Sequence, residues 1–236
     1  MTRHELKEQL EHDRFKDVVQ TAYEYTLSNR QNVIRLAIVA VVALAIVAGA
    51  IWYMQARRVA RQHDLQGAME LSEAQVGAPA SDVGKTFPTQ TAKDAAVLKA
   101  FKDVAAKDAG SKEGMIAEYY AGTLEAQTTS DVKDAEARLQ KVVNDGGAFA
   151  LLAKIALARI EYFNGDKNGA VSLLQSIMNK PSDLVSKSDA QIVLAQLMST
   201  TEPKQAKAVL NSIRNPTQDP DLARAIEQLQ GQLNGQ

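Results

Sequence analysis

The chain has 236 residues, with 27 Lys or Arg against 28 Asp or Glu, so its formal net charge at pH 7 is −1. This balance lacks the clustered basic surface that nucleic-acid binding requires, and the absence of cysteine excludes disulfides, thiolate catalysis and cysteine-based metal sites. Abundant Ala, Leu, Gln, Lys and Glu, with only 5% aromatic residues, favour helix. We therefore predict an all-α protein without a nucleic-acid partner.

Residues 1–35 form a polar arm that contains six basic and six acidic residues. Apolar side chains recur in it at helical spacings, which predicts a helix: Leu6, Leu10, Val18, Ala22 and Tyr25. Two interpretations of this arm remain open. It is either a solvated helix or a docking surface for a partner protein.

Residues 36–54, LAIVAVVALAIVAGAIWYM, contain no charge. A helix of this length spans roughly 28 Å, close to the hydrocarbon thickness of a bilayer. Trp52 and Tyr53 lie at one end, where aromatic rings prefer the membrane interface. Core helices rarely reach this length without a polar residue, and a cleaved signal peptide has a shorter apolar core. We predict a single transmembrane helix in contact with the lipid bilayer.

The charges beside this segment leave its orientation open. Arg30 and Arg35 flank its N-terminal end. Arg57, Arg58 and Arg61 follow its C-terminal end. The positive-inside rule applied to this difference of one residue favours a cytoplasmic C-terminal part only slightly.

Residues 55–93 are predicted to be a helix that continues to Val76, followed by a loop over 77–93 that is rich in Gly, Pro, Ser and Thr. Within the loop, Gly84-Lys85-Thr86 matches the end of a phosphate-binding motif. Pro79 stands where that motif requires its first glycine, and no strand is predicted before it. We interpret the match as chance.

Residues 94–236 are predicted to form a repeat domain, because three segments between residues 115 and 214 superpose with offsets of 35 to 37 residues. One small residue marks a helix A and a second marks a helix B, with a leucine four residues and a β-branched residue seven residues after the second. The four columns are Gly122, Ala158 and Ala195; Ala135, Ala170 and Ala206; Leu139, Leu174 and Leu210; Val142, Ile177 and Ile213. Small residues let the two helices approach, while the leucine and β-branched positions share one face that the next hairpin covers.

The turns between the predicted helices agree with this pattern. Asn164-Gly165-Asp166 supplies a glycine to end helix A and an aspartate to cap helix B, and Glu202-Pro203 begins the helix B of the third copy. Residues 94–107 are predicted to be a further helix B, paired with a helix A over 58–76. A helix at 221–234 is expected to cap the array.

The second copy, LLAKIALARIEYFNGDKNGAVSLLQSIMNKP, resembles a tetratricopeptide repeat in Leu157-Ala158, Gly165-Asp166, Ala170 and Leu174. The arm, the single span and about four degenerate repeats resemble the bacterial membrane-anchored tetratricopeptide-like family, the YfgM-like proteins. The resemblance implies a single-pass protein of the bacterial inner membrane, with its N-terminus in the cytoplasm and its repeats in the periplasm. It also implies an ancillary factor near the Sec translocon that recruits periplasmic chaperones or nascent chains.

We expect no enzyme activity, cofactor or metal. His4, His12 and His63 lie outside the repeats without the spacing of a zinc site, and no nucleophile motif is present. The carboxylates are interpreted as lying on polar faces between basic residues, with no pocket that would perturb their pKa. No residue is therefore predicted to be catalytic.

A concave surface lined by the A helices is the candidate partner-binding site. Repeat positions place seven residues on it: Tyr119, Thr123, Ile155, Arg159, Tyr162, Ile192 and Gln196. Aromatic residues and arginine often anchor a bound polypeptide, although the tyrosines and isoleucines could instead fill the core. The predicted function is a membrane-anchored protein–protein interaction scaffold, and the alternative is a scaffold or regulator that faces the cytoplasm. The sequence leaves the oligomeric state open.

Overall fold

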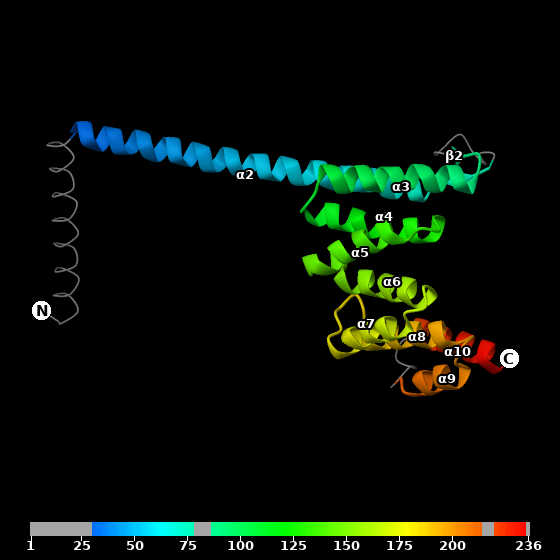
Figure 1. Ribbon diagram of the computed structural model, residues 1–236. Helices are drawn as coiled ribbons and strands as arrows, with labels where there is room; N and C mark the ends of the chain where they lie inside the picture. The colour runs from blue at the N-terminus through cyan, green and yellow to red at the C-terminus, as the bar shows by residue number, and fades with distance from the viewer. Residues whose placement is uncertain (1–29, 78–85, 214–219, 235–236) are drawn as a thin grey trace, which may run out of the picture. The chain divides into compact units, whose positions relative to one another are not determined.

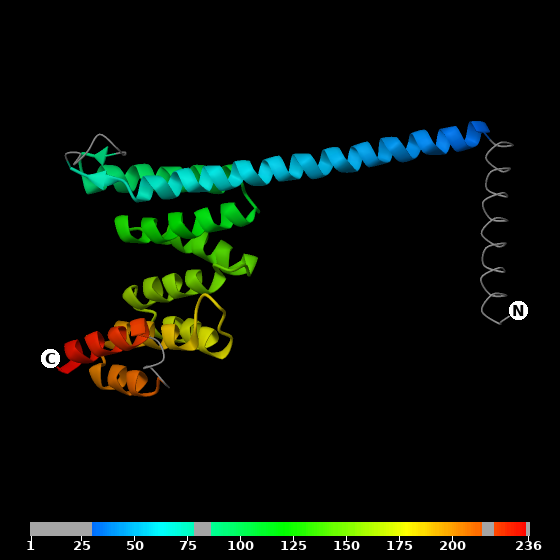
Figure 2. The same ribbon diagram turned by 180° about the vertical axis from the view of Figure 1, so that it is seen from behind.

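The computed structural model describes residues 30–77, 86–213 and 220–234, and within these ranges it is an all-α solenoid with one short strand pair (Figures 1 and 2). The elements in chain order are α2 (Arg30–Ser72), β1 (Gln75–Val76), β2 (Thr86–Phe87), α3 (Gln90–Lys107), α4 (Lys112–Thr128), α5 (Lys133–Asp145), α6 (Ala150–Phe163), α7 (Lys167–Asn179), α8 (Lys187–Met198), α9 (Pro203–Asn211) and α10 (Pro220–Asn234). Two compact units divide the chain after Val59, within α2. Of the predicted arm over 1–35, residues 1–29 lie outside the described residues, and residues 30–35 belong to α2.

The first unit contains the apolar part of α2, where a helix was predicted over 36–54. Its most apolar 18-residue window has a mean hydropathy of 2.7, and none of that window is buried. Leu36, Leu44 and Trp52 are among the exposed apolar side chains. By length and composition, this helix is long and apolar enough to cross a membrane.

The segment after α2 differs from the prediction of a helix to Val76 and a loop over 77–93. The helix ends at Ser72, and Gln75–Val76 pairs in parallel with Thr86–Phe87. Gly77, at φ 103°, turns the chain directly after β1. The predicted loop also ends early, since the Thr89 side chain accepts a hydrogen bond from the Ala92 amide at 3.1 Å and begins α3 at Gln90.

The second unit, residues 60–236, is a stack of helical hairpins, and we call it the hairpin stack. The end of α2 packs on α3, and α4–α5, α6–α7 and α8–α9 form the following hairpins. The first helices of neighbouring hairpins also touch, α4 with α6 and α6 with α8, and α10 packs on α8 and α9. Figure 1 shows these layers in sequence order. Helices are present where the extra hairpin and the C-terminal cap were expected, since α3 packs on the end of α2 and α10 packs on the last hairpin.

The core of the hairpin stack consists of the predicted repeat columns. All twelve column residues are buried. Leu139, Leu174 and Ile177 are among the largest fully buried side chains that the structure describes. The periodicity therefore identifies the helix faces that pack within and between hairpins.

The predicted turn residues also have the backbone conformations and capping contacts expected of them. Gly165 adopts a left-handed φ of 97°, and Asp166 accepts a hydrogen bond from the Gly169 amide at 2.9 Å. Pro203 occupies the first turn of α9. These local signals fix where each helix of the second and third copies ends and begins.

Gly122 shows most directly why the small-residue columns need small side chains. A Cβ at this position would lie 3.0 Å from Leu139 Cγ and 3.3 Å from the Ala135 carbonyl oxygen. Because Leu139 is fully buried, we expect Gly122→Val to destabilise the hairpin stack by about 1–3 kcal/mol through overpacking. Urea unfolding followed by circular dichroism measures the change. Gly67→Val, at a helical glycine with open space around it, is the matched control and should be close to neutral.

Candidate polypeptide-binding groove

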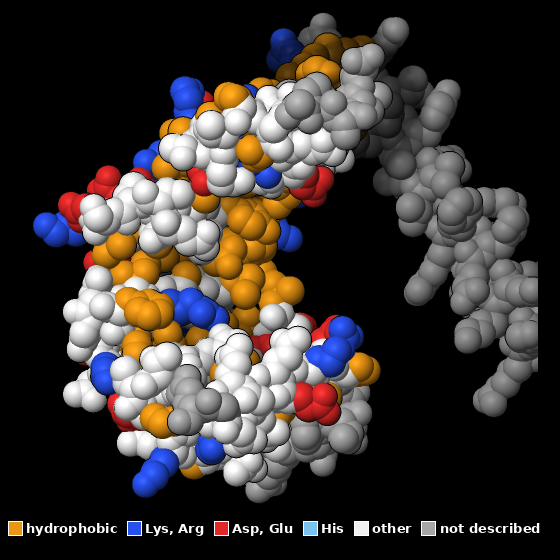
Figure 3. Space-filling view, turned by 90° about the vertical axis from the view of Figure 1, so that its right-hand side faces the viewer, with side chains coloured by type: hydrophobic (Ala, Val, Ile, Leu, Met, Phe, Trp, Pro, Cys, Tyr) orange, Lys and Arg blue, Asp and Glu red, His pale blue; other side chains and the backbone are white. Residues whose placement is uncertain are grey.

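A groove with a volume of about 560 Å³ lies between α4 and α6. Its lining is mostly apolar or aromatic: Tyr119, Tyr120, Thr123, Ala126, Gln127, Val132, Leu152, Ile155, Ala156, Arg159, Ile160, Phe163 and Asn164. Figure 3 shows a hollow on one face of the hairpin stack in which hydrophobic side chains gather. A concave apolar surface with a few polar groups is the usual form of a binding site.

Aromatic rings form one wall of this groove. The Tyr119 ring lies 5.2 Å from both Tyr120 and Phe149, and Tyr120 stacks on Phe101 at 5.1 Å between ring centroids. Phe101 is buried in α3, so the wall is anchored in the core of the preceding hairpin. Such ring pairs hold one another in fixed orientations.

The apolar surface continues from the groove toward α3. A smaller cavity of about 240 Å³ shares Tyr120, Thr123 and Gln127 with the groove and reaches Val97 and Phe101. The two hollows together extend along α3, α4 and α6. This extent suits a segment of polypeptide.

Nine of the residues that line the groove were not predicted from the sequence, and Phe163 is the exposed aromatic ring among them. It is the last residue of α6, and 79% of its surface is exposed, whereas the neighbouring Tyr162 is 6% exposed. One indication of it is present in the sequence: Phe163 is an apolar residue that lies directly before the Asn164-Gly165 turn and outside the repeat columns. A large exposed ring beside an apolar hollow is a candidate anchor for a partner.

Arg159 lies on the groove side of α6, and its Nη2 donates a hydrogen bond to Oε1 of Gln196 in α8 at 3.0 Å. Its side chain remains accessible to solvent, while burial among the groove walls lowers the pKa of the guanidinium from its ordinary value. An arginine keeps its positive charge at neutral pH under such a shift. Burial and the neighbouring Tyr120 raise the pKa of the Tyr119 phenol, which therefore stays neutral.

The seven predicted residues divide into two groups. Tyr119, Thr123, Ile155 and Arg159 line the groove, and the exposed Gln196 contacts Arg159. Tyr162 and Ile192 instead lie in the core, so the core-filling alternative describes their positions. The Tyr162 hydroxyl shares a 2.6 Å hydrogen bond with Thr201, a partner that repeat spacing does not indicate.

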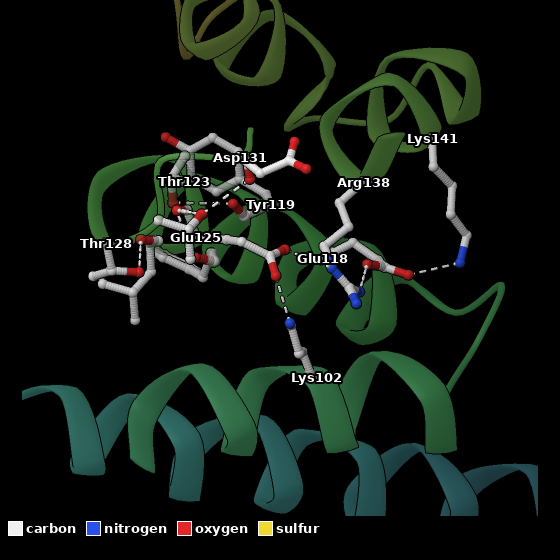
Figure 4. A network of polar contacts seen from close by, with 12 residues as sticks. Lys102, Glu118, Tyr119, Thr123, Glu125, Thr128, Asp131, Arg138 and Lys141 are labelled. Atoms are coloured by element: carbon white, nitrogen blue, oxygen red, sulfur yellow. Dashed lines mark hydrogen bonds and ion pairs between the residues drawn. The ribbon is translucent and has the colours of Figure 1, made fainter. Parts of the chain in front are cut away.

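A buried charge network holds α4 on its other side. Glu118 and Glu125 are buried, and Arg138 of α5 bridges them, with Nη1 at 2.7 Å from Glu118 and Nε at 3.1 Å from Glu125 (Figure 4). Lys141 lies 2.7 Å from Glu118, and Lys102 of α3 lies 2.5 Å from Glu125. The interpretation that the carboxylates lie on polar faces was therefore wrong for these two buried residues. A sequence pattern does not show partners that lie 13 to 23 residues away.

The network sets the protonation of Glu118. Burial alone would raise the pKa of this carboxyl, but hydrogen bonds from Lys141 and Arg138 outweigh it and lower the pKa below the ordinary value. Glu118 is thus ionised at neutral pH, and both carboxylates are paired with cations, as in a structural network. This pairing holds α5 against α4, the helix that also carries Tyr119 and Tyr120 of the aromatic wall.

Among the described residues, Glu161 is a further carboxyl with a shifted pKa, and it is not part of this network. Burial, Asp166 and Glu136 raise the pKa of Glu161, whose Oε2 atom has no hydrogen-bond partner in the structure, and Glu161 does not line the groove. Among the described residues, no cluster of three His, Asp or Glu side chains is arranged to hold a metal. His63 is exposed on α2, and His4 and His12 lie outside the described residues.

Comparison with known proteins gives no assignment for this groove, because no protein-family model, no curated protein and no solved structure matches the chain.

Proposed function

We propose that this protein is a membrane-anchored interaction scaffold whose groove binds a polypeptide segment of a partner protein. The observation that carries the proposal is the apolar hollow between α4 and α6, with its aromatic wall and the exposed Phe163. Clustered aromatic residues beside an arginine are typical of the residues that dominate binding energy in protein interfaces. The protein acts in this proposal by holding a partner, without catalysing a reaction.

The apolar part of α2, residues 36–54, anchors the protein by crossing the bacterial inner membrane. We place the N-terminus in the cytoplasm and the hairpin stack in the periplasm, on the resemblance to the YfgM-like family. Anchoring restricts the groove to a layer beside the membrane, which raises its effective concentration toward membrane-bound partners.

The proposed partner class is a periplasmic chaperone or a nascent chain beside the Sec translocon. The resemblance to the YfgM-like family supports this choice, and the groove supplies a surface of suitable chemistry, since polypeptide segments commonly dock through side chains that fill such grooves. The full-length chain should therefore co-purify from mild detergent with a Sec component or a periplasmic chaperone, identified by mass spectrometry.

A matched pair of variants tests whether the groove makes that contact. Phe163→Ala removes the exposed ring from the groove, and Leu184→Ala removes another exposed apolar side chain that lies outside it. We expect the first variant to lose the partner and the second to retain it. Recovery of the wild-type chain without any Sec or periplasmic-chaperone component would overturn the proposed partner class.

The alternative is a scaffold that faces the cytoplasm, and Arg57, Arg58 and Arg61 are the observation in its favour. Fusions at the C-terminus distinguish the two orientations. Alkaline phosphatase is active only in the periplasm, whereas a conventional green fluorescent protein exported in unfolded form does not fluoresce there. An active phosphatase fusion supports our orientation, and a bright fluorescent fusion reverses it.

A further inference from the structure

Arg159 alone carries a formal charge among the described residues that line the groove. Its hydrogen-bond partner is the neutral amide of Gln196, and its phenol neighbour Tyr119 is uncharged at neutral pH. Glu161, two residues along α6, faces Asp166 and Glu136 instead, since residues two apart on a helix do not share a face. Within the described part of the chain, Arg159 is therefore a cation in an apolar hollow that forms no ion pair with a carboxylate.

The chemistry of a guanidinium defines what complements it. It has five N–H donors in a planar fork, which matches a carboxylate through two parallel hydrogen bonds. The contact with Gln196 uses one donor nitrogen and supplies no negative charge. A carboxylate that enters the groove would be partly shielded from water by the same walls, so its attraction to Arg159 exceeds that of an exposed pair.

The position of Arg159 on α6 defines what surrounds that carboxylate. Ile155, Arg159 and Phe163 are spaced four residues apart and all line the groove, so they follow one another along the same face of the helix. Four helical residues rise about 6 Å, and two residues of an extended strand rise about 6.6 Å. Alternate side chains of an extended segment therefore have nearly the same spacing as this row of apolar, cationic and apolar side chains.

We propose that the groove binds an extended segment of the partner in which an acidic side chain, with an apolar side chain two residues away on either side, pairs with Arg159. This inference rests on the proposed function, because it names the ligand chemistry of the same groove. It goes beyond that function by defining a motif, apolar-x-acidic-x-apolar, that a partner must carry.

Defined peptides test the motif directly. The probes are fluorescent peptides, acetylated and amidated, with a central Phe-Ser-Glu-Ser-Leu, its Gln counterpart, and a shifted Phe-Glu-Ser-Ser-Leu. Anisotropy titration against the full chain in detergent measures each affinity. We expect the Glu peptide to bind about tenfold more tightly than the Gln peptide, in line with the strength of charge-assisted hydrogen bonds. The shifted peptide should lose this advantage, because a one-residue shift turns the carboxylate to the opposite side of a strand.

Two variants isolate the ion pair from the apolar contacts. Arg159→Gln removes the cation, and Gln196→Glu supplies a carboxylate beside it, at the position that already contacts Arg159. Both should abolish the preference for Glu over Gln, and the readout is the ratio of the two peptide affinities within each variant. Added salt should reduce the advantage of the Glu peptide in the wild-type chain.

The outcomes separate this inference from the proposed function. If Glu and Gln peptides bind equally and both are lost in Phe163→Ala, the acidic motif is overturned and the groove remains a binding site. If the groove instead prefers peptides whose acidic and apolar residues lie four positions apart, the bound segment is a helix and not an extended strand. Binding that neither Phe163→Ala nor Arg159→Gln affects, or no binding by any peptide, would overturn both the motif and the groove.

Discussion

Arg138→Met is expected to destabilise the hairpin stack by about 3 kcal/mol, because it leaves two buried carboxylates without the cation that bridges them. Arg138 contacts Glu118 at 2.7 Å and Glu125 at 3.1 Å, and each carboxylate would keep a single lysine. Chemical unfolding of residues 60–236 at pH 7 measures the loss. Lys99→Met is the matched control, since its ion pair with Asp103 is exposed and should contribute less than about 1 kcal/mol.

The same variant has a predicted pH dependence. The folded state lowers the pKa of Glu118, so ionisation of this group stabilises the wild-type protein above the ordinary carboxyl pKa of 4.5. That contribution is lost as the pH falls through the lowered folded pKa. The deficit of Arg138→Met should therefore be largest near neutral pH and shrink in acid. A loss that is equal at both pH values, or below 1 kcal/mol, would show that the network does not hold α4 in place.

The double variant Leu44→Arg and Val47→Arg is expected to release the protein from the membrane fraction. Both side chains are exposed near the middle of the apolar part of α2. Two arginines at the centre of a transmembrane helix cost roughly 5–7 kcal/mol on the biological insertion scale. The wild-type chain should resist extraction by alkaline carbonate, and the variant should be extracted.

Leu184→Arg provides the control for that experiment. It introduces the same side chain at an exposed apolar position outside α2 and should leave membrane association unchanged. Extraction of the wild-type protein by carbonate would contradict the proposed anchor. Retention of the double variant would place the membrane contact elsewhere in the chain.

The hairpin stack could be predicted because its determinants are local or periodic. Ala170 and Leu174 share a helix face by spacing alone, and Gly165-Asp166 marks a turn through backbone conformation and capping. Such signals are present in each copy without knowledge of the others. The pairing of Gln75–Val76 with Thr86–Phe87 has no such signal, because two residues are too few to show a pattern and their partner is supplied by a separate segment.

The candidate site could be predicted only in part for the same reason. Ile155 and Arg159 face the groove because the repeat period fixes the inner side of α6. Tyr162 belongs to the same helix, but its ring lies in the core, where its hydroxyl shares a hydrogen bond with the Thr201 hydroxyl of a later turn. The neighbouring Phe163 ring is exposed to solvent instead. Their difference depends on which tertiary neighbours cover each ring, and single-sequence spacing carries no such information.

The burial of Glu118 and Glu125 was the largest error of the sequence-based interpretation. A carboxylate on a helix usually faces water, and burial becomes tolerable only when several cations converge on it. Here those cations come from two other helices, through Lys102 and Arg138. Convergence of this kind is a property of the folded stack.

The central claim, that the groove of an anchored scaffold holds a partner polypeptide, is tested most directly by photocrosslinking in native membranes. A benzophenone amino acid is placed at Phe163 in the groove or at Gln140, an exposed position of α5 that does not line it. We predict one discrete adduct from position 163, identified by mass spectrometry as a Sec component, a periplasmic chaperone or a nascent chain, and none from position 140. Loss of that adduct in Ile155→Glu would place the contact within the groove. Identical adducts from both positions, or none from position 163, would contradict the account.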